Sequence, residues 1–174
     1  MSLQQNAEQT KPWLPEALNQ RIRDWRESLR GSLRDMLRAK LDHRETKELV
    51  LEMLRQDGLT VESVAGPREE GANTLCKVEM PYGMSTKMAV QVKMHWEEDH
   101  DTTGIEQLEH AFSAYGVSAG LLVTMADRLS EDLERRIEES RKKYNIRVLF
   151  GEELYTQLLG FAGAPDISEM PGAA

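Results

Sequence analysis

The sequence predicts an α/β fold in which a central mixed β-sheet is flanked by helices and preceded by an N-terminal helical extension. Three observations predict it. Residues 88–95 alternate between apolar and polar side chains, as a β-strand does. Residues 120–124 are apolar without interruption, which is typical of a strand buried on both faces. The last third of the chain alternates strand and helix patterns, and this succession requires part of the sheet to be parallel.

Composition narrows the class of protein. The 174 residues are enough to bury one sizeable core. The only cysteine, Cys76, excludes an internal disulfide and fits a reducing compartment. Residues 1–11 lack the apolar core of a signal peptide, and no apolar run is long enough to cross a bilayer. We therefore expect a soluble cytoplasmic protein. The net charge of −8 argues against a general nucleic-acid coat protein.

The chain divides into four parts by composition and pattern. A polar segment over residues 1–11 is expected to be a disordered tail. A helical extension over residues 12–41 precedes a folded domain over residues 42–160. Residues 161–174 are rich in glycine, alanine and proline and are expected to form a flexible tail. No internal repeat or low-complexity tract interrupts this order.

The extension carries one apolar stripe along a long helix. Its apolar residues recur at the helical period: Leu18, Ile22, Trp25, Leu29, Leu33, Met36 and Leu37. The stripe is longer than a terminal helix needs, and no second long helix in the sequence covers it. We expect the helix to pack against the domain and against a symmetry mate, which predicts a homodimer.

A stripe of arginines that includes Arg26, Arg30 and Arg34 runs beside the apolar stripe. Such arginines lay their aliphatic stems along a packed helix and pair with nearby acids, here Glu27 and Asp35. The same arginines alternatively form a ridge that binds the phosphates of DNA. Both interpretations stay open, and pairing is favoured.

The folded domain begins with a helix over residues 44–57. Asp42 and Glu45 form a capping box at its start, and Gly58 is a typical residue to end it. Strand patterns follow over residues 59–64, 73–80 and 88–95, separated by glycine- and proline-containing turns.

The segment 95–101 is acidic and has two histidines, but it lacks metal-ligand spacing, so a solvated connection is expected. Thr103 and Glu106 form a second capping box, which predicts a helix that ends near Gly116. The remaining pattern predicts a buried strand over 120–124, a helix over 130–144, a strand over 146–150 and a helix over 152–159.

Polar residues on the central strand carry the clearest functional signal. Gln91 and Lys93 are two residues apart, so they project from one face of the strand about 7 Å from each other. The succession of a helix with glutamates, a strand that begins near Asn73, and Gln91-Val92-Lys93 resembles the PD-(D/E)xK nuclease superfamily. Within it, the chain resembles the Mrr-type restriction endonucleases over residues 44–160. One residue departs from the family pattern, because Asn73 stands where the family has aspartate.

The resemblance implies a restriction-endonuclease-like fold and metal-dependent hydrolysis of double-stranded DNA, with Mg²⁺ or Mn²⁺ as the ion. By position, Lys93 is the catalytic lysine beside the attacking water, and Gln91 offers its amide carbonyl to the metal. Asn73 takes the place of the metal-anchoring aspartate and offers only a neutral oxygen. The family's spacing points to Glu48 as the helix glutamate of the catalytic and metal site, whereas the helical wheel favours Glu45.

Three hypotheses follow. The chain is an Mrr-like endonuclease, with activity impaired by Asn73, or a catalytically inactive nuclease-fold module for DNA binding or oligomerisation. The third hypothesis is an unrelated α/β protein in which Gln91 and Lys93 are only a polar strand face. DNA cleavage with Mg²⁺ or Mn²⁺ separates the first two, and the geometry around Lys93 separates both from the third.

Overall fold

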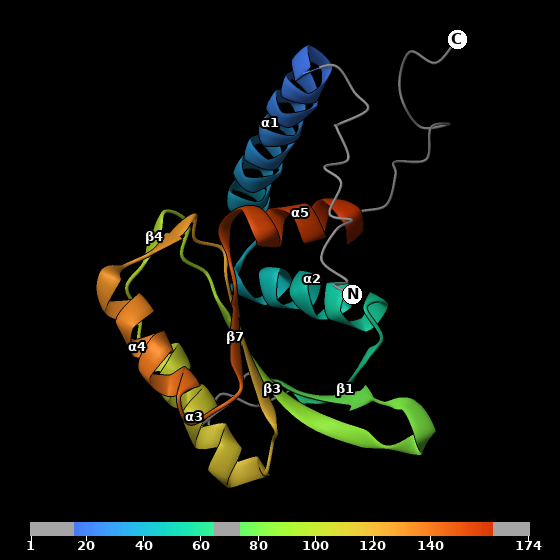
Figure 1. The fold of residues 1–174 in the computed structure, drawn as a ribbon, viewed down its shortest axis with the longest axis vertical. Coiled ribbons are helices and arrows are strands. Elements are labelled where there is room, and N and C mark those ends of the chain that lie inside the picture. Colours follow the sequence, from blue (N-terminus) through green and yellow to red (C-terminus); the bar gives the residue numbers. More distant parts are fainter. Residues whose placement is uncertain (1–15, 65–73, 162–174) are drawn as a thin grey trace, which may run out of the picture.

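The structure is a computed structural model that describes residues 16–64 and 74–161 (Figure 1). The helices are α1 (Glu16–Lys40), α2 (His43–Gln56), α3 (Thr103–Tyr115), α4 (Glu131–Arg141) and α5 (Gly151–Phe161). The strands are β1 (Leu59–Val64), β2 (Thr74–Glu79), β3 (Ser85–Lys93), β4 (Glu98–Asp99), β5 (Ala119–Thr124), β6 (Arg128–Leu129) and β7 (Ile146–Leu149). Asn73, the tail predicted over 1–11 and residues 162–174 of the second tail lie outside the described residues.

The central sheet has five strands in the order β1-β2-β3-β5-β7. β2 is antiparallel to both β1 and β3, whereas β5 is parallel to both β3 and β7. A short 3-10 turn over Pro81–Gly83 joins β2 to β3, and α3 and α4 form the longer crossovers that parallel neighbours require. The predicted mixed sheet flanked by helices, with a helix before it, is therefore confirmed.

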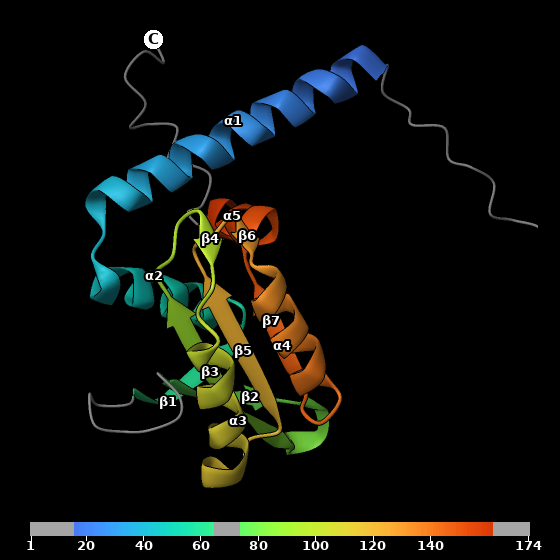
Figure 2. The ribbon, with the colours of Figure 1, turned by 90° about the vertical axis from the view of Figure 1, so that its left-hand side faces the viewer.

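Helices cover both faces of the sheet (Figures 1 and 2). α2 and α5 pack on the face to which β3 contributes Val90 and Val92. α3 and α4 pack on the opposite face, to which β3 contributes Ala89. Because side chains alternate along a strand, Gln91 and Lys93 belong to the face covered by α3.

α1 crosses one end of the sheet, and its N-terminal half extends beyond the rest of the domain (Figure 2). Near its C-terminal end, Leu33 and the buried Leu37 pack against the core that α2 and α5 cover. Three other large apolar residues of the helix are exposed: Leu18, Trp25 and Met36. Among the described residues, the apolar side chains of α1 that pack on this core thus come from its second half.

Three arginines also dock α1, on the segments that follow the parallel strands. Arg38 binds Glu97 after β3 at 3.7 Å, Arg34 binds Asp127 after β5 at 2.6 Å, and Arg30 binds Glu152 after β7 at 2.9 Å. Four residues of helix advance about 6 Å, and neighbouring strands lie about 4.8 Å apart. This similar spacing lets successive arginines meet the ends of successive strands. We call Arg26, Arg30, Arg34 and Arg38 the arginine row.

The structure corrects two local predictions. The segment 95–101, predicted as a solvated connection, contains β4, which pairs with β6, and its Asp99 is 0 % exposed. Strands of two residues are too short to give a periodic signal. The predicted capping box of Thr103 and Glu106 is also wrong. α3 begins at Thr103, whose backbone N–H donates to the carboxylate of Asp101 at 2.9 Å.

Candidate functional site

Lys93 is the last residue of β3, and two side chains just before and at the start of α3 hold its ammonium group. Lys93 Nζ donates to Asp101 Oδ2 at 2.8 Å and to Thr103 Oγ1 at 3.0 Å. The Lys93 side chain is only 17 % exposed. Gly104 makes room for its stem, because a Cβ there would lie 3.1 Å from Lys93 Cε and 3.0 Å from Leu122 Cδ1. The ammonium is therefore fixed at the carboxyl end of the sheet.

Asp101 links this lysine to the first turn of α3. Its Oδ1 accepts hydrogen bonds from the Thr103 backbone N–H at 2.9 Å and from the Thr103 hydroxyl at 2.6 Å. Burial alone would raise the pKa of Asp101, but hydrogen bonds from Lys93 and Thr103 and the charge of Lys93 outweigh it and lower the pKa to about 2. Asp101 is thus ionised at neutral pH and neutralises Lys93.

A second carboxylate, that of Asp99, lies beside this pair. Asp99 Oδ1 accepts the backbone N–H of Asp101 at 2.8 Å, and its buried Oδ2 has no hydrogen-bond partner among the described residues. His95 Nε2 lies 3.5 Å from Asp99 Oδ1 and 3.9 Å from Asp101 Oδ2. Two acids and a histidine therefore surround the end of β3 near Lys93.

Gln91 lies on the same face of β3 as Lys93, one pleat earlier. It is 1 % exposed, and its Nε2 donates to Gln107 Oε1 of α3 at 2.9 Å. The amide carries no net charge, so Gln91 adds no negative charge that would attract a cation. The structure thus places both strand residues of the family motif under α3.

The two candidate glutamates come from α2, which packs on the other face of the sheet. Glu45 Oε2 accepts the backbone N–H of Asp42 at 2.9 Å, and Asp42 accepts that of Glu45, so the predicted capping box is confirmed. Glu48 is exposed. In the described part of the chain, neither glutamate forms an ion pair with Lys93. Because Asn73 lies outside that part, the convergence of the predicted site stays a prediction.

A dication needs several ligands arranged around one point. Among the residues that the structure describes, no group of three or more His, Cys, Asp or Glu side chains is arranged to hold a metal ion. Asp101 is already bound to Lys93. The described residues therefore do not form a metal site by themselves. A site that Asn73 and Glu48 complete remains a prediction.

The three candidate DNA-binding arginines have different surroundings. Arg30 and Arg34 bind carboxylates of the domain, and Arg34 also pairs with Asp35 at 3.4 Å, which agrees with the pairing interpretation. The charge of Asp127 raises the pKa of Arg34. Arg26 forms no ion pair with any residue in the described ranges. The arginines therefore serve two purposes, and only Arg26 is left for a ligand.

Sequence reasoning missed Asp101 and Thr103 as the partners of Lys93. The signal that could have found them is local, because an acid two residues before a helix start is a common cap for the first backbone N–H groups.

None of the described helices combines the length and the apolar character needed to cross a membrane.

Comparisons with known proteins place the domain in a family. The Mrr catalytic-domain model, described as a restriction endonuclease, matches residues 38–158. The search of curated proteins gives no match. Among solved structures, the chain is similar to the MspJI restriction endonuclease in complex with a 27-mer oligonucleotide, at 13 % identity and a TM-score of 0.47, over 76 % of this chain and 30 % of that one. The chain thus spans less than a third of that protein's chain. With most of its folded part matched by the family model, the chain belongs to the Mrr-type restriction endonuclease family.

Proposed function

We propose that this chain is an Mrr-type endonuclease domain for double-stranded DNA whose phosphodiester hydrolysis is impaired. The position of Lys93 carries the proposal. Its ammonium lies at the carboxyl end of a parallel strand, where α/β folds place their ligands, and its charge is held there by Asp101 and Thr103. Family membership supports DNA as the substrate.

Impairment is proposed because the acid that anchors a metal is missing from the sequence. Asn73 and Gln91 are both neutral, so the two strand positions together supply no formal negative charge. Asp101 is the carboxylate that meets Lys93, but its two oxygens already accept hydrogen bonds from Lys93 and Thr103. We keep Mg²⁺ or Mn²⁺ as the proposed ion for the site with the acid restored, and Glu48 or Glu45 as its helix ligand.

The alternative is an inactive nuclease-fold module that binds DNA or oligomerises. The pairing of Lys93 with Asp101 favours it, because a lysine already neutralised by a carboxylate attracts a phosphate less strongly. A homodimer through α1 and a cytoplasmic location also remain proposals from the sequence. Sedimentation velocity at tens of micromolar, a concentration above the roughly micromolar Kd of a stable interface, tests the dimer.

The experiment that separates the two is the restoration of the acid. Asn73→Asp is expected to raise affinity for Mg²⁺ or Mn²⁺, measured by calorimetry, and to produce cleavage of supercoiled plasmid DNA. Adding Lys93→Ala is expected to abolish that cleavage while the circular dichroism spectrum stays native.

Asn145→Asp is the matched control, because Asn145 lies in the exposed turn before β7 and the change adds the same charge away from Lys93. If Asn73→Asp gains neither metal affinity nor cleavage over this control, the inactive module is the correct function. If the unaltered chain already cleaves plasmid DNA, the proposed impairment is wrong.

A further inference from the structure

The arginine row has one member that the domain does not use. Arg30, Arg34 and Arg38 each bind an acid that follows one of the three parallel strands. β7 is the edge of the sheet, so no further strand end is available to Arg26, one helical turn earlier. In the described part of the chain Arg26 forms no ion pair, and it therefore presents its charge beyond the sheet edge, above α5.

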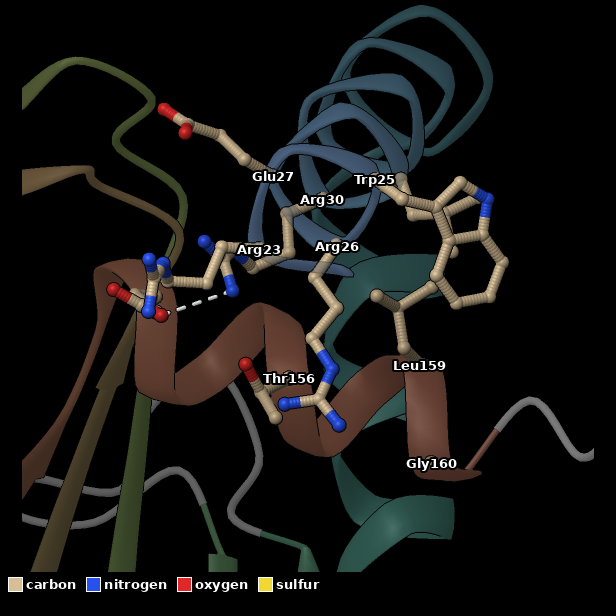
Figure 3. A pocket seen from close by; sticks show the side chains of 10 residues that line it. Arg23, Trp25, Arg26, Glu27, Arg30, Thr156, Leu159 and Gly160 are labelled. Carbon is tan, nitrogen blue, oxygen red and sulfur yellow. Dashed lines mark ion pairs between the residues drawn. The ribbon is translucent and has the colours of Figure 1, made fainter. Parts of the chain in front are cut away.

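A cleft between α1 and α5 surrounds Arg26 (Figure 3). Its volume is about 640 Å³, within the range of about 300–1,000 Å³ that is usual for small-ligand sites. Figure 3 shows the guanidinium of Arg26 directed toward Thr156 of α5, and the indole of Trp25 beside Leu159. Trp25 is 63 % exposed. The cleft thus offers a cation and a hydroxyl next to a flat apolar surface.

The charges in the cleft leave a positive centre. Arg30 and Glu152 bind each other at 2.9 Å, so their charges cancel on one side of the cleft. Arg23 hydrogen-bonds to the neutral Gln20 at 2.6 Å rather than to a carboxylate. Among the described residues, Glu27 is the only other acid that lines the cleft, so Arg23 and Arg26 leave its described lining with a net charge of about +1. An anionic group is therefore the expected occupant.

A second copy of α1 is a poorer occupant. Leu18, Ile22, Trp25 and Leu29 follow the spacing of a coiled-coil seam, and Arg21 and Arg26 flank that seam on its two sides. In a parallel pair of such helices, Arg21 of one helix would face Arg26 of the other. Like charges at flanking positions disfavour pairing, so the parallel association of two such helices is disfavoured.

We propose that the cleft between α1 and α5 binds one nucleotide of a single-stranded stretch of nucleic acid. Arg26, with Arg23, binds the phosphate, and the unpaired base stacks on the Trp25 indole. The choice of nucleic acid rests on the proposed function, but binding here requires no catalysis. The arginine row crosses the carboxyl ends of β3, β5 and β7 in turn. The cleft lies next along this row, at the same end of the sheet as Lys93.

Stacking of a base on an aromatic side chain is sequence-tolerant and contributes strongly to single-strand binding. The phosphate contact adds a salt dependence, because each neutralised phosphate of a single strand steepens the slope of log K against log salt by about 0.7. These two contributions give separate readouts for Trp25 and Arg26.

The test is anisotropy of a labelled single-stranded oligonucleotide with the full chain in EDTA. Arg26→Gln is expected to weaken binding about fivefold and to reduce the salt slope by about 0.7. Arg21→Gln is the matched control, since it removes the same charge from the same helix outside the cleft, and it is expected to change affinity less than about twofold. Trp25→Leu is expected to cost about tenfold, and Trp25→Phe clearly less, because phenylalanine keeps an aromatic face.

Equal losses for Arg26→Gln and Arg21→Gln would overturn the site in favour of diffuse charge attraction. Polyglutamate that competes as well as the oligonucleotide would assign the cleft to an acidic polypeptide instead. If Trp25→Leu turns a dimer into a monomer in sedimentation and leaves oligonucleotide affinity unchanged, the face is a self-interface. Plasmid cleavage by the Asn73→Asp chain is measured separately, so failure of the endonuclease proposal is distinguishable from failure of this one.

Discussion

The contact between Asp101 and Lys93 predicts a pH-dependent part of the folding free energy. In Asp101→Asn the carbonyl oxygen can still accept the Thr103 backbone N–H, which keeps the cap of α3, but the neutral amide no longer pairs with Lys93. A pKa lowered from 3.8 to about 2 corresponds to about 2 kcal/mol of stabilisation at neutral pH. Since the Asp101 side chain is only 27 % exposed, solvent screening removes a minor part of this amount.

The sign follows from the direction of the shift. The folded-state pKa of Asp101 is depressed, so the stabilisation is present above the unfolded-state pKa of about 3.9 and is lost as pH falls toward about 2. Urea unfolding of the native chain and of Asp101→Asn is expected to differ by about 2 kcal/mol near pH 7 and by little near pH 2. The variant should therefore lose less stability on acidification than the native chain.

A double-mutant cycle with Lys93→Met isolates the pair, and its coupling energy is expected to be about 1–2 kcal/mol, between the values for exposed and buried ion pairs. Glu138→Gln is the control, because Glu138 pairs with Arg141 on an exposed helix face and should cost less than about 0.5 kcal/mol. A difference between Asp101→Asn and the native chain that does not vary with pH, or a coupling near zero, would refute this reasoning.

Two further predictions concern packing. Gly104→Ala is expected to destabilise the fold by about 1–2 kcal/mol, because its Cβ would press on the buried Leu122 and on the stem of Lys93. Gly31→Ala is its control and is expected to stabilise α1 by about 0.5–1 kcal/mol, since nothing lies within 4 Å of that Cβ. Melting temperatures measured by calorimetry that shift in the same direction for both variants would contradict these two expectations. Burial raises the pKa of the Cys76 thiol to about 11, so at about pH 8 a thiol reagent should label Cys76 only at the rate of unfolding. Rapid labelling of the folded chain would show that the Cys76 region opens locally.

The fold could be predicted because its signals are local and periodic. The alternation in the sequence of β3, the apolar run of β5 and the cap formed by Asp42 and Glu45 each depend on a few neighbouring residues, and the structure has the two strands and the capped helix. The site was predictable only in part. Gln91 and Lys93 could be placed on one face by the period of a strand, but their partners come from the segment before α3 and from α3 itself.

The arginines of α1 show what a local sequence pattern cannot predict. Helical periodicity places Arg30 and Arg34 on one side of α1, but it cannot say that the acids they meet follow β7 and β5. That depends on the order of strands in the sheet, which no local pattern encodes. For the same reason the sequence could not show that Arg26 would differ from its neighbours in the row.

Because of the arginine row, an inserted residue should be more harmful in one part of α1 than in another. One residue inserted between Arg30 and Arg38 would rotate part of the row by about 100°, so that the arginines on one side of the insertion could no longer meet their acids. An insertion before Arg23 would leave the arginine row in phase, because the ion pairs that α1 forms with other described elements begin at Arg30. Length variation among relatives of this chain should therefore accumulate toward the N-terminal end of α1, whereas the number of residues between Arg30 and Arg38 should remain fixed.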